Sequence, residues 1–250
     1  MACNKFDYFA GEDIGCREHQ EDMFDAIAIE DEDALLMVLA DGMGGHAAGE
    51  VASQTAIERF IHTFRRHPAA SIAARLGASL QASIEGLDEA VQLVPEFGDM
   101  GCTIVGTFVA KDQIHWISVG DSPLYLFRSG SLRQLNEDHS LAQILDKAAA
   151  SGEIPRSEAD NHPDRQTLLS VLAGYEMPTK IDCPMTPTPL MPGDTVVLAS
   201  DGLQTLSDEE IAEILASDTT AQETTTRLIA AVKAKDVPGQ DNIAIQLVRL

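Results

Sequence analysis

Residues 34–46 read ALLMVLADGMGGH, and this stretch decides the fold prediction. Its seven apolar residues, Ala34 to Ala40, run without polar alternation, which is typical of a strand buried on both faces. The run is far too short to cross a membrane. Asp41 and Gly42 follow it directly, so we expect a carboxylate at the end of a rigid strand, beside a glycine that lets the chain turn.

The segments around this strand predict a mixture of hairpins and paired helices. Apolar patterns predict further strands at 23–30, 104–110, 113–119, 124–128, 132–135, 195–199 and 243–248. Helical spacing predicts helices from Gly49 to just before Pro68, and over 71–94, 140–150, 208–216 and 221–235. Ser207 and Glu210 have the spacing of a capping box. Because hairpins pair strands antiparallel, this order predicts antiparallel sheets with helix layers rather than a parallel α/β fold.

The composition is that of an acidic globular protein. The 250 residues carry 40 Asp and Glu against 17 Lys and Arg, a net charge of −23, and 44% of them are hydrophobic. This surplus argues against nucleic acid and against an anionic membrane as partners, and it suits divalent cations, which prefer oxygen ligands. The four cysteines show no metal spacing and the N-terminus has no apolar signal region, so we expect a reduced, cytoplasmic protein.

Four aspartates stand next to predicted strands. Asp41, Asp121 and Asp201 each follow an apolar strand, and Asp241 precedes the last one. Any single Asp-Gly pair is an ordinary turn signal. Four such carboxylates in one chain instead indicate a divalent-metal site, since two or three suffice for Mg²⁺ or Mn²⁺. Two adjacent ions could activate a water for in-line displacement at phosphorus. The residues alone leave both readings open.

Arg17 is the candidate phosphate ligand. It is one of two basic residues among the first 50, which hold 13 acidic ones. Its planar guanidinium can hold two phosphate oxygens. The alternative is a surface ion pair with an acidic neighbour.

Six short motifs follow one another along the chain: Gly15-Cys16-Arg17-Glu18-His19-Gln20-Glu21-Asp22, Leu39-Ala40-Asp41-Gly42-Met43-Gly44-Gly45-His46, Gly101-Cys102-Thr103, Gly120-Asp121-Ser122, Ser200-Asp201-Gly202 and Asp241-Asn242. In this order they resemble the metal-dependent protein phosphatases of the 2C type, in their bacterial single-domain form. The resemblance runs from about residue 8 nearly to the end. It implies an α+β fold, a four-layer α-β-β-α sandwich of two antiparallel sheets flanked by antiparallel helix pairs. The proline-rich stretch at about 138–190 itself predicts a flap or insert within a single domain over 1–250, and the resemblance places a flap near 138–178, beside the active site.

The resemblance implies a centre of two Mn²⁺ or Mg²⁺ ions. Asp41 would bridge both ions, and the carbonyl of Gly42 would serve the first. Asp201 and Asp241 would hold the second ion.

Further residues are implied around this centre. Asp22 and Glu21 would bind the waters of the metals, and Asp22 is therefore counted among the metal residues. Asp121 would join Asp201 in holding a possible third ion. Arg17 would grip the phosphate of the substrate.

The chain also departs from the family pattern. Gln20 replaces the usual Asn and keeps its amide, whereas Pro123 replaces an Arg near the third-metal region. Met43 stands where eukaryotic relatives carry a candidate general-acid His. His46 is expected beside the centre, either in proton transfer or as a structural histidine, and Asn242 is expected beside the ligands.

The resemblance implies a serine/threonine protein phosphatase. A metal-bridging water would attack the phosphorus of phosphoserine or phosphothreonine, with no phosphoenzyme. The expected partners are phosphorylated proteins and a cognate bacterial Ser/Thr kinase, and the expected state is a monomer. Two alternatives remain: a catalytically silent phosphoprotein-binding module on the same fold, and a two-metal phosphodiesterase or small-molecule phosphatase.

Overall fold

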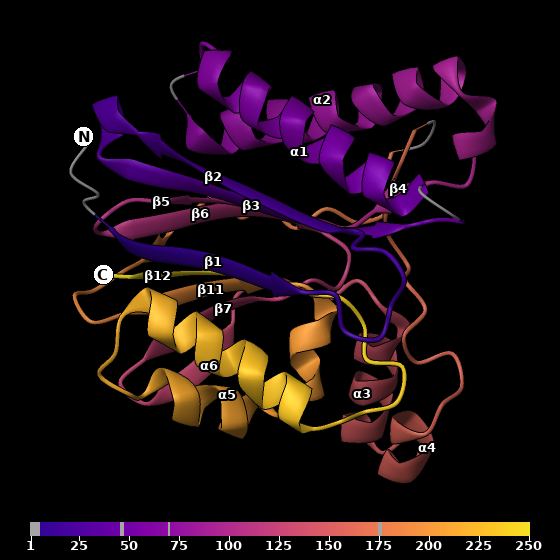
Figure 1. The fold of residues 1–250 in the computed structure, drawn as a ribbon, viewed down its shortest axis with the longest axis vertical. Coiled ribbons are helices and arrows are strands. Elements are labelled where there is room, and N and C mark those ends of the chain that lie inside the picture. Colours follow the sequence, from indigo (N-terminus) through magenta and orange to yellow (C-terminus); the bar gives the residue numbers. More distant parts are fainter. Residues whose placement is uncertain (1–5, 46–47, 70, 175–176) are drawn as a thin grey trace.

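Two antiparallel sheets lie face to face in the centre of the molecule (Figure 1). The protein is described from a computed structural model, which covers residues 6–45, 48–69, 71–174 and 177–250. The five-stranded sheet has the order β1 (Asp7–Asp13), β12 (Ile243–Arg249), β11 (Thr195–Ala199), β7 (Leu124–Arg128) and β8 (Ser131–Gln134). The seven-stranded sheet has the order β10 (Thr188–Pro189), β6 (Gln113–Val119), β5 (Ile104–Val109), β3 (Ala34–Met43), β4 (Gly101–Cys102) and β9 (Leu172–Ala173). The seventh strand of this sheet, β2 (Asp22–Ile29), lies outside that order and pairs with β3.

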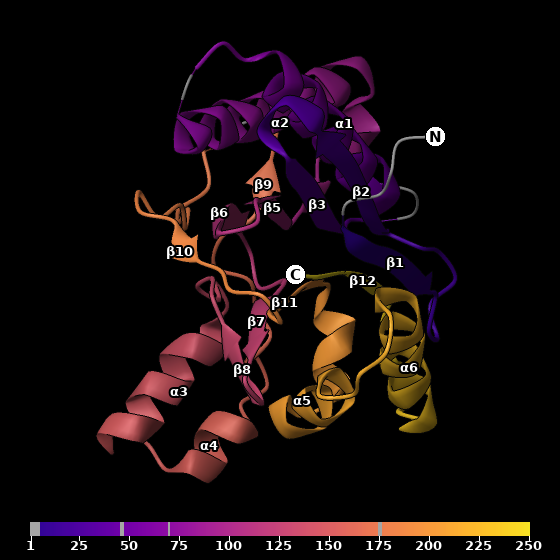
Figure 2. The same ribbon diagram turned by 90° about the vertical axis from the view of Figure 1, so that its left-hand side faces the viewer.

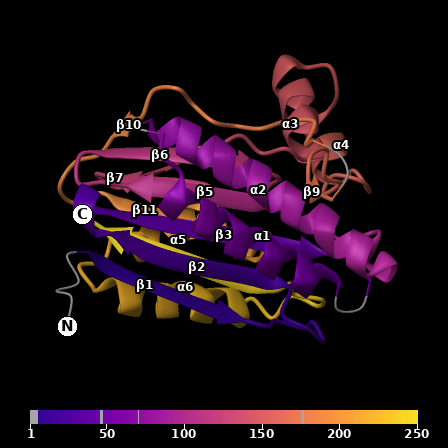
Figure 3. The same ribbon diagram turned by 90° about the horizontal axis from the view of Figure 1, so that it is seen from above.

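Helix pairs cover the outer faces of the two sheets. Helices α1 (Ala48–Arg66) and α2 (Ile72–Leu93) lie over the seven-stranded sheet, as Figure 3 shows from above. Helices α5 (Asp208–Leu215) and α6 (Ala221–Ala234) cover the five-stranded sheet. Helices α3 (Leu141–Ser151) and α4 (Arg156–Asp160) lie to one side of the sandwich (Figure 2). The arrangement confirms the predicted α+β sandwich of four layers.

Strand β3 borders two of the three apolar layers, as its unbroken apolar run predicts. One layer lies between the seven-stranded sheet and α1 and α2, the second between the sheets, and the third between the five-stranded sheet and α5 and α6. Alternate residues of β3 enter the first two layers: Leu36, Val38 and Ala40 on one face, and Leu35, Met37 and Leu39 on the other.

The predicted strands and helices are confirmed with small shifts of their ends. Strand β3 continues to Met43, three residues past its predicted end, because Gly42 and Met43 pair with Cys102 and Gly101. Asp41 therefore lies within the strand and not after it. The Ser207 capping box is confirmed, since the Ser207 hydroxyl accepts the Glu210 amide and the Glu210 carboxylate accepts the Ser207 amide.

Several short elements and one whole strand were not predicted from the sequence. They are β1, β4, β9, β10, α4 and the 3₁₀ turns η1 (Glu30–Glu32), η2 (Pro95–Phe97) and η3 (Asp201–Thr205). No helix among the described residues is both long and apolar enough to span a membrane.

The contact between α1 and β5 gives a test of the packing. A Cβ at Gly106 of β5 would lie 2.4 Å from Cζ of Phe60, whose side chain is completely buried. Gly106→Ala is expected to lower the free energy of unfolding by about 1–3 kcal/mol, because the ring has to move in a filled core. The matched control is Gly77→Ala in α2, where a Cβ meets no atom within 4 Å; it should raise stability by about 0.5–1 kcal/mol. Denaturant unfolding measures both, and equal effects would contradict the packing.

Candidate active site

Acidic side chains from both sheets meet at one end of the sandwich. Asp41 is part of β3 and Asp121 follows β6, both in the seven-stranded sheet. Asp201 follows β11 and Asp241 precedes β12, both in the five-stranded sheet. All four line one cavity of about 260 Å³. The strand-end positions seen in the sequence therefore do bring these carboxylates together.

Asp22 and Asp41 stand directly opposite each other in the antiparallel pair of β2 and β3. Like charges in this position repel, and Asp22 is only 3% exposed while Asp41 lies partly buried in the cavity. Burial, followed by the repulsion of Asp22 and the other aspartates, raises the pKa of Asp41 well above its ordinary value. Burial also raises the pKa of Asp22 to about 7, helped by Asp201 and Asp241 and opposed by a hydrogen bond with Ser200.

The same causes act on the carboxylates of the other strands. Burial raises the pKa of Asp121 to about 7, with further contributions from Asp201 and Asp138. Burial and the charge of Asp241 raise the pKa of Asp201 to about 6, against the opposing charge of Arg17. The backbone thus forces together groups that resist being ionised together.

The donor set fits divalent metal ions. Oδ2 of Asp22 and Oδ1 of Asp201 are buried and have no hydrogen-bond partner among the described residues. Hard oxygen donors of this kind are what Mg²⁺ and Mn²⁺ prefer, and a cation would relieve the repulsion that raises these pKa values. Within the described ranges, however, no three His, Cys, Asp or Glu side chains are already arranged to enclose an ion.

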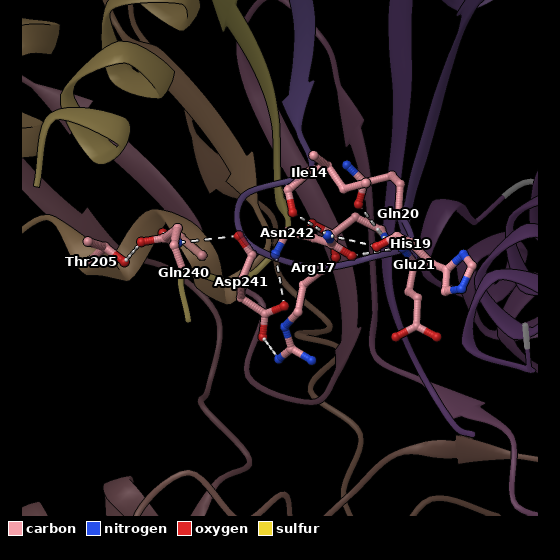
Figure 4. A network of polar contacts seen from close by, with 11 residues as sticks. Ile14, Arg17, His19, Gln20, Glu21, Thr205, Gln240, Asp241 and Asn242 are labelled. Atoms are coloured by element: carbon pink, nitrogen blue, oxygen red, sulfur yellow. Dashed lines mark hydrogen bonds and ion pairs between the residues drawn. The ribbon is translucent and has the colours of Figure 1, made fainter. Parts of the chain in front are cut away.

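Arg17 places a positive charge at the rim of this cavity (Figure 4). Its Nη2 lies 2.5 Å from Oδ2 of Asp241, and the guanidinium is about half exposed. Gly15, two residues earlier, has a φ of +62°, and a Cβ there would lie 2.3 Å from the Asp241 carbonyl oxygen. The amide of Cys16 donates to the Gln240 carbonyl at 2.8 Å. The loop that carries Arg17 is thus pressed against residues 240–241.

Asn242 fastens the two loops together, as the dashed lines of Figure 4 show. Its Oδ1 accepts the amide of Glu21 at 2.8 Å. Its Nδ2 donates to the carbonyls of Ile14 at 2.9 Å and His19 at 3.0 Å. Gln20 uses its amide nearby, since its Oε1 accepts the Asp22 amide at 3.2 Å. The position of Arg17 and of Asp22 therefore depends on side-chain amides and not on charge pairs alone.

Gly42 lies where the backbone of three segments meets. A Cβ at this residue would stand 2.2 Å from the carbonyl oxygen of Gly49 and 2.7 Å from that of Glu21. Its amide donates to the Glu21 carbonyl at 3.1 Å. Only glycine allows this approach, which presses β3 against the start of α1 beside Asp41.

Thr103 holds the backbone of Asp41 on the other side of β3. Its hydroxyl accepts the Asp41 amide at 3.0 Å, and its own amide donates to the Asp41 carbonyl at 2.9 Å. The same hydroxyl is 2.7 Å from that of Ser122. This buried network connects Asp41 to the loop of Asp121.

The comparison with known families agrees with this geometry. A model of the family described as protein phosphatase 2C matches residues 15–245, which include every described residue of the cavity named so far. This chain belongs to that family.

Relatives of the protein phosphatase 2C family match the chain over most of its length. The serine/threonine phosphatase stp of Listeria monocytogenes serotype 4b (strain F2365) is 36% identical over 237 residues, which cover 93% of this chain and 90% of that protein. The crystal structure of PstP/Ppp from Mycobacterium tuberculosis has a TM-score of 0.83 at 33% identity and covers 97% of both chains. A crystal structure of the PstP catalytic domain in complex with two manganese ions has a TM-score of 0.79 at 32% identity, covering 97% of this chain and 96% of that one.

The residues predicted for a 2C-type site lie together wherever the structure describes them. The cavity is lined by Arg17, Glu21, Asp41, Gly42, Asp121, Asp201, Asp241 and Asn242, and Asp22 is buried behind Asp41. His46 lies outside the described residues. Sequence reasoning gave no role to Thr103, Ser122, Gln166 or Leu168, although the last two also line the cavity. Thr103 and Ser122 stand inside quoted motifs, which was their only signal.

The raised pKa values predict a link between metal binding and protons. At about pH 6 several of these carboxylates retain protons that an ion must displace, whereas at about pH 8.5 fewer do. Mn²⁺ binding should therefore release more protons, and be weaker, at the lower pH. Calorimetry in buffers of different ionisation enthalpy measures both quantities. Asp22→Asn should reduce the release at about pH 6, and a release that does not vary with pH would contradict the shifts.

The same shifts predict how stability varies with pH in the presence of a chelator. An acid whose pKa is raised by folding binds more protons in the folded than in the unfolded state. The free energy of unfolding should therefore fall as the pH rises from about 4 to about 7 through these groups. Chemical unfolding across this range, in wild type and in Asp22→Asn, measures the effect. A fall of the same size in both proteins would exclude Asp22 as a source.

Proposed function

We propose that this chain is a metal-dependent protein phosphatase that hydrolyses phosphoserine and phosphothreonine on proteins. The observation that carries the proposal is the cavity in which Asp41, Asp121 and Asp201, whose pKa values are raised, meet the guanidinium of Arg17. The names of its relatives as serine/threonine phosphatases, and the two manganese ions of one of them, support the same activity.

We propose the following division of work among the carboxylates. Asp41, which lies close to carboxylates of both sheets, would be shared by two Mn²⁺ or Mg²⁺ ions, and the Gly42 carbonyl would serve the first. Asp201 and Asp241 would hold the second ion. The bound ions supply an activated water and stabilise negative charge at phosphorus.

Residues around this centre have supporting roles in the proposal. Glu21 and Asp22 would hold waters of the ions, which is in keeping with the burial of Asp22 opposite Asp41 on the neighbouring strand. Asp121 and Asp201, from different sheets, hold a third ion where one binds. Asn242 keeps the loop of residues 14–21 in place through its three hydrogen bonds.

Arg17 binds the phosphate of the substrate in this proposal. Its exposed guanidinium stands at the cavity rim, and its planar fork can donate two parallel hydrogen bonds to phosphate oxygens. Its contact with Asp241 keeps the charge next to the ligands of the second ion.

A larger groove supports a protein substrate. It has a volume of about 890 Å³ and shares Arg17, Asp121, Gln166, Asp201 and Asp241 with the cavity. It continues between helices α3 and α4 on one side and η3 and the start of α5 on the other. A phosphorylated side chain can enter the cavity while the polypeptide that carries it lies along the groove. Residues between Asp138 and Gln166 line one wall. We propose that the segment at about 138–190 acts as a flap within a single domain over 1–250.

We further propose that the enzyme opposes a Ser/Thr kinase and acts in the cytoplasm as a monomer. A kinase must supply its phosphorylated substrates, and the free thiols of Cys16, Cys102 and Cys183 suit a reducing compartment. Light scattering should give a mass close to the 26.9 kDa of one chain.

Removing the bridging carboxylate tests the metal mechanism. Turnover of a phosphothreonine peptide and of p-nitrophenyl phosphate should require Mn²⁺, stop with a chelator, and fall by about 10²-fold or more in Asp41→Asn. The control is Asp112→Asn, which removes the same charge from an exposed turn. Activity that survives chelation would contradict the mechanism. Metal-dependent peptide binding without turnover would favour a silent module, and turnover of p-nitrophenyl phosphate alone would favour a small-molecule phosphatase.

Substitution of Arg17 tests its role in binding phosphate. Arg17→Ala should lower kcat/KM by about 10- to 100-fold, mainly through a higher KM, because a charged hydrogen-bond donor is lost. Arg17→Lys keeps the charge without the fork and should recover only part of the loss. Arg227→Ala, which changes an exposed arginine of α6 that contacts Ser217, is the control. An unchanged KM in Arg17→Ala would exclude the proposed role.

A further inference from the structure

His139 lies directly behind the loop of Asp121, at the start of the predicted flap or insert, and it was not among the predicted site residues. Its side chain is only 1% exposed. The amide of Gly120 donates to Nδ1 of His139 at 3.2 Å, and the amide of His139 donates to the Gly120 carbonyl at 3.1 Å. Strand β6 ends at Val119, so both backbone groups of Gly120 fall outside the sheet ladder, and His139 bonds both.

Gly120, whose backbone His139 bonds, directly precedes Asp121, which lines the cavity. Gly120 has a φ of +104°, and a Cβ there would lie 2.5 Å from Cγ2 of Thr103. The loop therefore rests on Thr103 on one side and on His139 on the other. Since the carboxylate of Asp121 follows Gly120 by one residue, the direction of this peptide determines where that carboxylate stands.

His139 also reaches the opposite wall of the cavity. Its carbonyl accepts the amide of Leu169 at 2.8 Å, and the amide of Leu141 donates to the Thr167 carbonyl at 2.9 Å. The two ends of the segment that carries α3 and α4 are thus joined at His139. Gln166 and Leu168, on the returning end, line the cavity. One buried residue therefore connects the Asp121 loop to the side chains that face it.

The two ring nitrogens of His139 differ in their hydrogen bonds. Nδ1 can accept the Gly120 amide only if the proton is on Nε2, and burial lowers the pKa of His139, which favours this neutral ring. Nε2 is buried without a partner among the described residues. An unpaired buried donor is unfavourable, so the acceptor at Nδ1 is the group with a structural use here.

We propose that His139 is a positioning residue of the phosphatase reaction: it holds Asp121 through the Gly120 peptide and couples that carboxylate to residues 166–168. The proposal rests on the phosphatase function proposed above. In the proposed function Asp121 would hold the ion, whereas the hydrogen bonds of His139 described here go to backbone groups, so the substitution should act on metal binding and turnover through geometry.

Substitutions that keep or remove the acceptor test this proposal. Asn places its Oδ1 as many bonds from the backbone as Nδ1 of His, whereas Leu has no acceptor and Gln carries its oxygen one bond farther out. Asp121→Asn identifies the Mn²⁺ binding event that depends on Asp121. In His139→Leu we expect the affinity of that event to fall by about 10-fold or more, and kcat to fall as well. His139→Gln should show the same loss of affinity. This variant replaces His139→Leu in the test if the Leu variant does not fold. His139→Asn should stay within about threefold of wild type.

The readouts are Mn²⁺ titration by calorimetry and by electron paramagnetic resonance, and kcat and KM measured separately. The control is His115→Leu on β6, since His115 is a half-buried histidine against Phe108 and also has a ring nitrogen without a partner among the described residues. It should alter stability and leave the Mn²⁺ titration unchanged. Combining His139→Leu with Asp121→Asn should weaken Mn²⁺ binding no further than Asp121→Asn alone.

Several results would overturn the proposal. Equal Mn²⁺ titrations in the Asn, Leu and Gln variants would show that the acceptor has no role. A change in thermal stability alone, as expected for His115→Leu, would reduce His139 to a structural residue. Absence of turnover in wild type would instead refute the phosphatase function, and the Mn²⁺ titrations would still decide whether His139 positions Asp121.

Discussion

The structure depends on holding mutually repelling carboxylates in one place. The pairing of β2 with β3 sets Asp22 opposite Asp41, and the ends of strands in both sheets add Asp121, Asp201 and Asp241. Burial and repulsion together raise the pKa values of Asp22, Asp41, Asp121 and Asp201, so this end of the sandwich is a source of instability unless cations are bound. The stability that opposes this strain must come from elsewhere. The three apolar layers, and the rigid strands that connect them, provide it.

Three side chains around the site, those of Asn242, Thr103 and His139, bond backbone groups of the segments that carry the carboxylates. Asn242 bonds the amide of Glu21 and two carbonyls, and Thr103 bonds the amide and carbonyl of Asp41. His139 does the same for Gly120. These three ties fix the backbone beside the carboxylates without using carboxylate oxygens, as preorganised binding requires. Arg17 differs from them, because it bonds Oδ2 of Asp241 directly.

The sequence predicted those features that depend on local pattern. The apolar run 34–40 indicated a strand buried on both faces, and the aspartates beside strands indicated the site. Strand β1 was missed because DYFAGED is acidic and contains glycine, and it becomes a strand only by pairing with β12 from the far end of the chain. The role of His139 was missed for a related reason. Its partners, Gly120 and Leu169, lie 19 and 30 residues away, and no local pattern reports such contacts.

The net charge of −23 can be divided into a part at the site and a larger part on the rest of the surface. Two divalent ions would reduce it to −19, so most of the excess remains after the site is filled. This remaining charge repels acidic substrates at long range, and more so at low salt. Attraction must then be local, from the ions and from Arg17 at the cavity rim. The groove beyond the rim contains Arg156 and Arg165, but both are paired with Asp146. A phosphorylated segment with basic flanking residues meets less repulsion on this path than an acidic one, which makes the surface itself a source of selectivity.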